Sequence, residues 1–288
     1  MKRPLVLACG VAALTGALAG QETTFKAEAR LVEVYAAVFD RHGRYLPGLT
    51  KEQFQVIDSD KPQSIVTFET EASDLSCAIL LDTTGSMARA LPAVKNAILK
   101  LIDQFRGNDQ VAVYGFSNRL AVLQPFTADR NAAKKAVLAT RPAGTTALFD
   151  AVSQLARDVA RRGGKKVIVA FTDGQDNSSA LHAAAAVTRA KRAGVPIYAV
   201  AQGEALRSPA LARQLKDMAK STGGIAYEVR KTSDVDEVFE DISNDLRNSY
   251  LLTYKPPPAA DPKWRPIQVA IIGVKDCKIR AKEGYYPE

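Results

Sequence analysis

Oxygen-bearing side chains alternate after an apolar stretch near residue 80 and could hold a metal ion. Asp82, Thr84 and Ser86 follow the run LSCAILL directly, and Gly85 between them permits a tight turn. Because these side chains occupy alternate positions, their carboxylate and hydroxyl groups can face the same side of one loop. Such groups are the hard oxygen ligands that Mg²⁺ or Ca²⁺ prefers. The spacing therefore predicts a divalent-cation site on this loop.

Two further segments can complete the same site. The apolar run KVIVAFT ends at Asp173, which delivers a second carboxylate, and Thr146 precedes a helix-like stretch and offers another hydroxyl. Each residue alone has an ordinary structural interpretation, since Ser86 can be a helix N-cap and Asp173 with Gly174 a turn. Their joint occurrence on three loops favours one metal site, formed by Asp82, Thr84, Ser86, Thr146 and Asp173.

The elements that must position these loops alternate between strands and helices from residue 74 onward. Short apolar runs predict buried strands, and apolar residues three and four positions apart predict helices. This order predicts a doubly wound, Rossmann-like α/β fold with a mostly parallel sheet, whose ligands lie beyond the carboxyl ends of the strands. The predicted strands are 75–81, 110–116 with a companion at 120–123, 166–172, 196–201 and 225–228, and the predicted helices are 87–105, 130–138, 148–161, 180–193, 209–222 and 233–247.

Both ends of the chain are β-rich instead. Alternating patterns predict strands over 26–39, 250–254, 267–272 and 277–282, and a hairpin of residues 54–58 with residues 64–68. We expect the two flanks to pair with each other and form a small β-rich appendage. The predicted division is a signal peptide at 1–20, an N-terminal flank at 21–73, the α/β domain at 74–247 and a C-terminal flank at 248–288.

The first residues have the pattern of a secretory signal peptide. Lys2 and Arg3 precede an apolar run over 5–18, and an A-x-A pattern predicts cleavage near Ala19 or Gly20. A membrane-anchoring helix is the alternative, but the run is shorter than the roughly 20 residues that cross a bilayer. The sequence therefore predicts an exported protein, periplasmic or secreted, with no membrane span in its mature form.

Composition and charge exclude some classes of partner. Hydrophobic residues at 47% and charged residues at 24% match a soluble globular protein. The formal charge of +8 falls to about +6 when Lys2 and Arg3 leave with the signal peptide. The basic residues are scattered and not interleaved with aromatic ones, so no nucleic-acid partner is expected.

Two cysteines, Cys77 and Cys277, remain after the predicted cleavage of the signal peptide. Either a disulfide between them or a buried Cys77 thiol fits the sequence.

Catalysis is disfavoured by what the sequence lacks. The chain has two histidines, His42 in the β-rich flank and His182 in a predicted helix, and no serine in a G-x-S-x-G context. It has no phosphate-binding GxxxxGK[ST] loop. A phosphatase motif D-x-D-x-T would need a carboxylate where Thr84 stands. We therefore expect no catalytic residues, and the metal site predicts a binding protein.

These motifs resemble the metal-ion-dependent adhesion site of the von Willebrand factor A family. That site combines D-x-S-x-S with a separate threonine and a separate aspartate, and Asp82-Thr83-Thr84-Gly85-Ser86, Thr146 in GTTALFDA and Asp173 in FTDG match it. Thr84 replaces the usual serine but keeps a hydroxyl. The resemblance covers about 74–247. It implies that Asp82, Thr84 and Ser86 hold the ion, while Thr146 and Asp173 change between direct and indirect contact as a ligand arrives.

The flanks are similar to those of bacterial members of this family, with the course V-x-V-x-x-x-V-x-D-x-x-G after residue 31 and S-Y-L-L-T-Y-K-P near the C-terminus. The resemblance implies an interaction module in which a divalent cation, Mg²⁺ first and Mn²⁺ or Ca²⁺ as alternatives, binds an Asp or Glu carboxylate of a partner protein. The other interpretations are a metal-free structural module and a metal-dependent phosphoryl-transfer hydrolase. Asp150 and Asp176 are interpreted as supporting or helix-capping residues.

Overall fold

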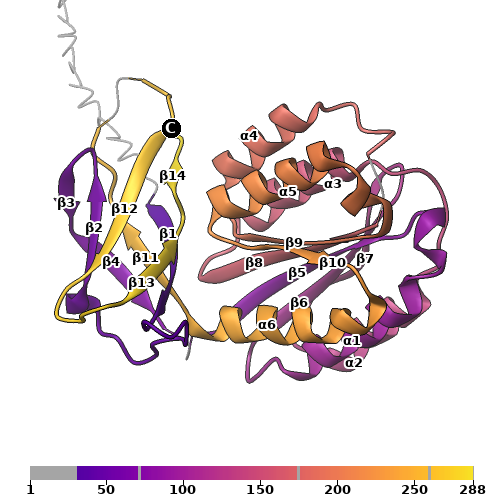
Figure 1. Cartoon of the computed structure of the whole chain (residues 1–288), viewed down its shortest axis with the longest axis horizontal. Coiled ribbons are helices and arrows are strands. Elements are labelled where there is room, and N and C mark those ends of the chain that lie inside the picture. Colours follow the sequence, from indigo (N-terminus) through magenta and orange to yellow (C-terminus); the bar gives the residue numbers. More distant parts are fainter. Residues whose placement is uncertain (1–30, 71–72, 174–175, 259–260, 288) are drawn as a thin grey trace, which may run out of the picture.

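A computed structural model describes residues 31–70, 73–173, 176–258 and 261–287 of the chain. It contains an α/β unit and a β unit that lie side by side (Figure 1). The predicted signal peptide at 1–20 lies outside the described residues. No helix among the described residues is long and apolar enough to cross a membrane.

The α/β unit is built on a six-stranded sheet in the order β10-β9-β8-β5-β6-β7. All neighbouring strands are parallel except β7, which pairs antiparallel with β6 at one edge. The predicted doubly wound, mostly parallel α/β sheet is therefore confirmed. The central strands β5 and β8 are buried along their whole length, as their continuous apolar runs predict. The strands are β5 (Leu75–Asp82), β6 (Gln110–Phe116), β7 (Leu120–Thr127), β8 (Lys165–Thr172), β9 (Ile197–Gln202) and β10 (Ala226–Val229).

Helices cover both faces of this sheet, each over its own apolar core (Figure 1). The predicted helix 87–105 begins later than expected, because Gly85–Ala88 form a separate 3-10 turn and Pro92 lies in the first turn of α1. One face carries α1 (Leu91–Asp103), α2 (Arg130–Ala139) and α6 (Val235–Asn248), and the other carries α3 (Leu148–Val159), α4 (Ala183–Ala193) and α5 (Pro209–Thr222).

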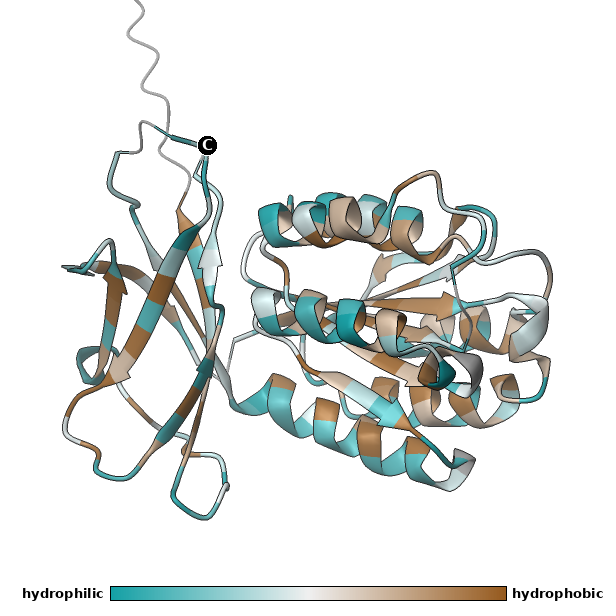
Figure 2. Ribbon diagram, turned by 45° about the horizontal axis from the view of Figure 1, so that its top comes forward, coloured by the Kyte–Doolittle hydropathy of each residue, from teal (hydrophilic) through white to brown (hydrophobic). Residues whose placement is uncertain are grey.

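The β unit consists of two four-stranded sheets, in the orders β13-β1-β11-β4 and β14-β12-β2-β3. Each sheet combines strands from both ends of the chain, since β1 pairs with β11 and β2 pairs with β12. The expected pairing of the flanks is therefore present, and buried apolar residues of both sheets form one core. Hydrophobic residues alternate with hydrophilic ones along these strands (Figure 2). The strands are β1 (Val32–Phe39), β2 (Phe54–Asp58), β3 (Lys61–Gln63), β4 (Ile65–Glu69), β11 (Ser249–Tyr254), β12 (Arg265–Ile271), β13 (Lys278–Ala281) and β14 (Gly284–Tyr285).

The predicted hairpin of residues 54–58 with residues 64–68 is wrong. Ser59 and Asp60 adopt positive φ angles of 55° and 60°, which make a two-residue turn and pair β2 with β3 instead. The following strand, β4, leaves for the other sheet and pairs with β11.

A buried ion pair joins the two units. Asp245 on α6 is fully buried and forms an ion pair with Arg280 of β13. The hydroxyl of Tyr45, in the loop after β1, donates to the Asp245 carboxylate at 2.9 Å, and Tyr198 of β9 donates to its other oxygen. One carboxylate thus gathers side chains from both units. The backbone then runs from α6 directly into β11.

Candidate metal centre

The Asp82 carboxylate lies at the carboxyl end of β5 and is held from both sides. It is fully buried. Its Oδ1 accepts the backbone N–H of Thr84 at 2.9 Å, and its Oδ2 accepts the hydroxyl of Thr172 at 2.8 Å. Thr172 is the last residue of β8, the neighbouring strand. The chain changes direction across the sheet between these two strands, which is where doubly wound folds bind ligands.

Three further side chains continue from this carboxylate in a hydrogen-bonded row. The hydroxyl oxygens of Thr84 and Ser86 lie 2.9 Å apart, and the Ser86 hydroxyl donates to Oδ1 of Asp173 at 2.8 Å. Thr84 and Asp173 are nearly buried, whereas Ser86 is exposed. The structure therefore brings four of the five predicted residues together at one edge of the sheet.

The fifth predicted residue, Thr146, lies on an adjoining loop. The N–H of Ala143 donates to the carbonyl of Thr83 at 2.6 Å, which fixes this loop against the loop of Asp82. Thr146 itself is buried, and its N–H donates to Oδ1 of Asn177 at 3.0 Å. Among the described contacts, no hydrogen bond joins the Thr146 hydroxyl to the other four side chains. Its loop is in place beside the site, but its hydroxyl is not part of the row.

The donor set fits a small divalent cation. Mg²⁺ takes six oxygens at 2.0–2.1 Å in an octahedron, so neighbouring ligand oxygens lie about 2.9 Å apart. The two oxygen separations that involve Ser86, 2.9 Å to Thr84 and 2.8 Å to Asp173, match this edge length. No group of three or more His, Cys, Asp or Glu with a metal-binding arrangement occurs in the described part of the chain. The candidate centre is instead a mixture of carboxylates and hydroxyls.

Burial and hydrogen bonding act in opposite directions on Asp82. Burial raises the pKa of its carboxyl group, while hydrogen bonds from Thr84, Thr172 and the backbone of Asp173 lower it. The net direction is upward. A nearby cation would favour the charged form of this carboxylate.

Several supporting residues complete the site. The Asp176 carboxylate accepts the N–H of Phe149 at the start of α3, and that of Asp150 accepts the N–H groups of Ala180 and Leu181. Both therefore hold backbone, in agreement with the interpretation as supporting residues. Thr172 and Asn177 were not predicted. Thr172 could have been identified from the sequence, because it directly precedes Asp173 at the end of an apolar run.

Comparison with known sequences gives a match over most of the α/β unit. The model of the von Willebrand factor type A domain matches residues 77–241. Human integrin alpha-D is 25% identical over 166 residues, which are 54% of this chain and 14% of that protein. The chain therefore spans a small part of this relative's length.

Solved structures share the fold. A von Willebrand factor type A protein from Catenulispora acidiphila is 16% identical with a TM-score of 0.55, covering 88% of this chain and 73% of its own. Proximal thread matrix protein 1 from the mussel byssus, solved with a zinc-occupied MIDAS motif, is 18% identical with a TM-score of 0.54 and covers 67% of this chain and 50% of its own. At these identities the similarity concerns the fold.

Proposed function

The chain belongs to the von Willebrand factor type A domain family, whose model matches more than half of it, and we propose that it is a metal-dependent protein-binding module. The row of oxygens from Thr84 through Ser86 to Asp173, beside the buried Asp82, is the observation that carries this proposal. Domains of this family generally serve protein–protein interaction, as in integrins. The proposal assigns the same kind of task to this chain.

The roles of the side chains follow from their contacts. Asp82, Thr84 and Ser86 would hold the ion directly or through water, and Asp173 would orient the Ser86 hydroxyl that it accepts. Thr146 would contribute from its adjoining loop. When bound, a divalent cation with mostly neutral hydroxyl ligands stays electrophilic and offers an open position to an Asp or Glu carboxylate of a partner protein. Mg²⁺ is the expected ion, and zinc enters as an alternative from the mussel protein.

Thermal unfolding of the full chain tests the metal site directly. The midpoint is compared in chelator and in Mg²⁺, Mn²⁺, Ca²⁺ or Zn²⁺, for the natural chain, Asp82→Ala and the control Asp241→Ala, which changes an exposed aspartate on α6. An ion at a hundred times its Kd stabilises by about 2.7 kcal/mol. We therefore expect an increase on the order of 5 °C in the natural chain and in the control, and none in Asp82→Ala.

Two results would contradict the proposal. If the ions raise the midpoint of Asp82→Ala as much as that of the natural chain, or raise neither, the proposed site is wrong. A metal-free structural module predicts the second result. A phosphoryl-transfer hydrolase predicts metal-dependent release of phosphate from a phosphate ester, which we do not expect.

The partner is sought by cross-linking and capture with and without chelator. We expect capture of a protein through an acidic residue, lost in chelator and in Asp82→Ala. Because the signal-peptide pattern predicts export, the periplasm and the culture medium are the fractions to use. N-terminal sequencing of the mature protein checks this proposal, with a start near residue 20 expected.

A further inference from the structure

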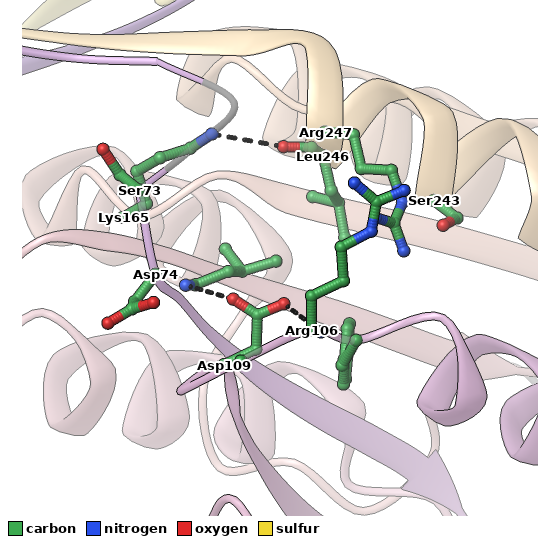
Figure 3. Close-up of a pocket in the computed structure, with 11 residues that line it drawn as sticks. Ser73, Asp74, Arg106, Asp109, Lys165, Ser243, Leu246 and Arg247 are labelled. Carbon is green, nitrogen blue, oxygen red and sulfur yellow. Dashed lines mark hydrogen bonds between the residues drawn. The ribbon is translucent and has the colours of Figure 1, made fainter.

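A pocket lies at the amino ends of β5 and β8, at the opposite end of these strands from the candidate metal centre (Figure 3). Leu75, Phe105 and Leu246 provide its apolar walls. Ser73 and Arg247, which also line it, belong to the two places where the chain passes between the β unit and the α/β unit. The cavity measures about 190 Å³. Drug-sized ligands occupy roughly 300 Å³ or more, so the pocket suits a compact ligand.

Two arginine side chains face this pocket together. Figure 3 shows Arg106 and Arg247 reaching toward each other beside Ser243. The Arg247 guanidinium donates to the backbone carbonyl of Gln104. Neither arginine has an ion-pair partner among the described residues, and no hydrogen bond of the Arg106 side chain is found there. Burial first, and then the charge of Arg106, lower the pKa of Arg247, while the nearby charge of Asp109 raises it; the net direction is downward.

The other charged groups of the pocket are already engaged with the backbone. The Nζ of Lys165, which is buried, donates to the carbonyls of Ser249 at 2.9 Å and of Leu246 at 3.3 Å. The Asp109 carboxylate accepts the N–H groups of Leu75 and Arg106, both at 2.8 Å. Asp74 is exposed at the rim. The guanidinium groups of Arg106 and Arg247 are therefore the side-chain donors that lie together at this pocket.

We propose that this pocket binds a compact phosphate-class oxyanion between the guanidinium groups of Arg106 and Arg247. A guanidinium presents parallel N–H donors that match the oxygens of a phosphate, and two such groups match the charge of a dianion. The anion also relieves the repulsion between two neighbouring cations. The inference is independent of the proposed metal centre.

Isothermal titration of the full chain with inorganic phosphate tests this site. Chelator removes any contribution from a metal ion, and chloride keeps the ionic strength constant. The natural chain is expected to bind phosphate saturably, and Arg106→Gln and Arg247→Gln to bind it roughly tenfold more weakly. Arg189→Gln, which changes an exposed arginine on α4, should bind like the natural chain. A parallel titration with phosphoserine separates the free ion from a phosphate ester as the natural ligand.

The decisive variant is Arg106→Gln, because Arg247 also holds the carbonyl of Gln104 and its loss could disturb folding. The proposal fails if the natural chain shows no saturable heat with either ligand at concentrations on the order of 10 mM, which corresponds to less than about 3 kcal/mol of binding. It also fails if Arg106→Gln binds phosphate as tightly as the natural chain does.

Discussion

The hydroxyl of Thr84, rather than its methyl group, is the feature that the metal site needs. This hydroxyl lies 2.9 Å from that of Ser86. Thr84→Ser keeps the oxygen, so we expect it to bind Mn²⁺ within about threefold of the natural chain, whereas Thr84→Ala should bind it roughly tenfold more weakly. Titration of each variant with Mn²⁺ measures the two affinities. Equal affinities for the serine and alanine variants would remove Thr84 from the set of ligands.

Cys77 and Cys277 have different surroundings, and neither is in a disulfide in this structure. Cys77 is buried in β5, and burial raises the pKa of its thiol, which leaves little thiolate. Cys277 is partly exposed. Brief alkylation of the native chain, read by peptide mass spectrometry, should therefore label Cys277 and leave Cys77 unlabelled until the protein is unfolded. Protection of both residues that ends only on reduction would instead indicate a disulfide.

Four residues of the candidate centre were predictable because they end or follow a strand. Asp82 and Asp173 come directly after apolar runs, and alternation placed Thr84 and Ser86 beside Asp82. Asn177 was not predictable in the same way. Its contact with the N–H of Thr146 depends on two loops that are 31 positions apart in the chain. Such pairings depend on loop conformation, which spacing alone does not determine.

At the scale of elements, the junction between α5 and β10 depends on a glycine. A Cβ atom on Gly224 would lie 2.1 Å from the carbonyl oxygen of Ile197, at the start of β9. Because backbone must move to admit it, Gly224→Ala should lower the free energy of unfolding by about 3 kcal/mol. Urea denaturation measures this loss.

Gly163→Ala is the matched control, since a Cβ there meets nothing within 4 Å. It should change the free energy of unfolding by less than about 0.5 kcal/mol. Equal stability of the two variants would mean that the approach of Gly224 to β9 is looser than the structure has it.

The elements were predicted well where hydrophobic pattern alone determines them. The apolar runs at β5 and β8 have the length and continuity of buried strands, and the regular apolar spacing of α1 marks its buried face. The pattern failed for β4, whose strand character was correct but whose partner was not. The pairing there is set by a two-residue turn in which Ser59 and Asp60 have positive φ angles. Asn-Gly is a strong sequence signal for such a turn, whereas Ser-Asp is not.

At the scale of the molecule, the flanks form one unit because β11 follows α6 without a linker and pairs with β1. The β-rich character of both ends predicted this pairing, but nothing local predicted how the two units attach. The ion pair of Asp245 with Arg280 joins residues 35 positions apart through tertiary structure alone. The domain boundaries at residues 73 and 248 remain a prediction. Limited proteolysis tests them, and cleavage is expected at those two points.

The contacts of Asp245 with Arg280, Tyr45 and Tyr198 should make the two units unfold together. Asp245 is fully buried, and Asp245→Asn leaves Arg280 without its counter-charge while Tyr45 and Tyr198 keep a weaker acceptor. Loss of one partner of a buried ion pair costs about 3 kcal/mol or more. We expect urea unfolding to change from one transition to two, with faster cleavage by trypsin between the units.

An exposed ion pair across the same boundary provides the comparison. Lys220 of α5 contacts Glu283 of the β unit at 2.8 Å, with the Lys220 side chain 78% exposed. Water screens this pair, so Lys220→Gln should cost less than about 1 kcal/mol and leave a single transition. If Lys220→Gln separates the transitions as much as Asp245→Asn does, the units are coupled by surface contacts. If neither variant separates them, other contacts across the boundary, such as the ion pair of Lys166 with Glu33, are sufficient to couple the units.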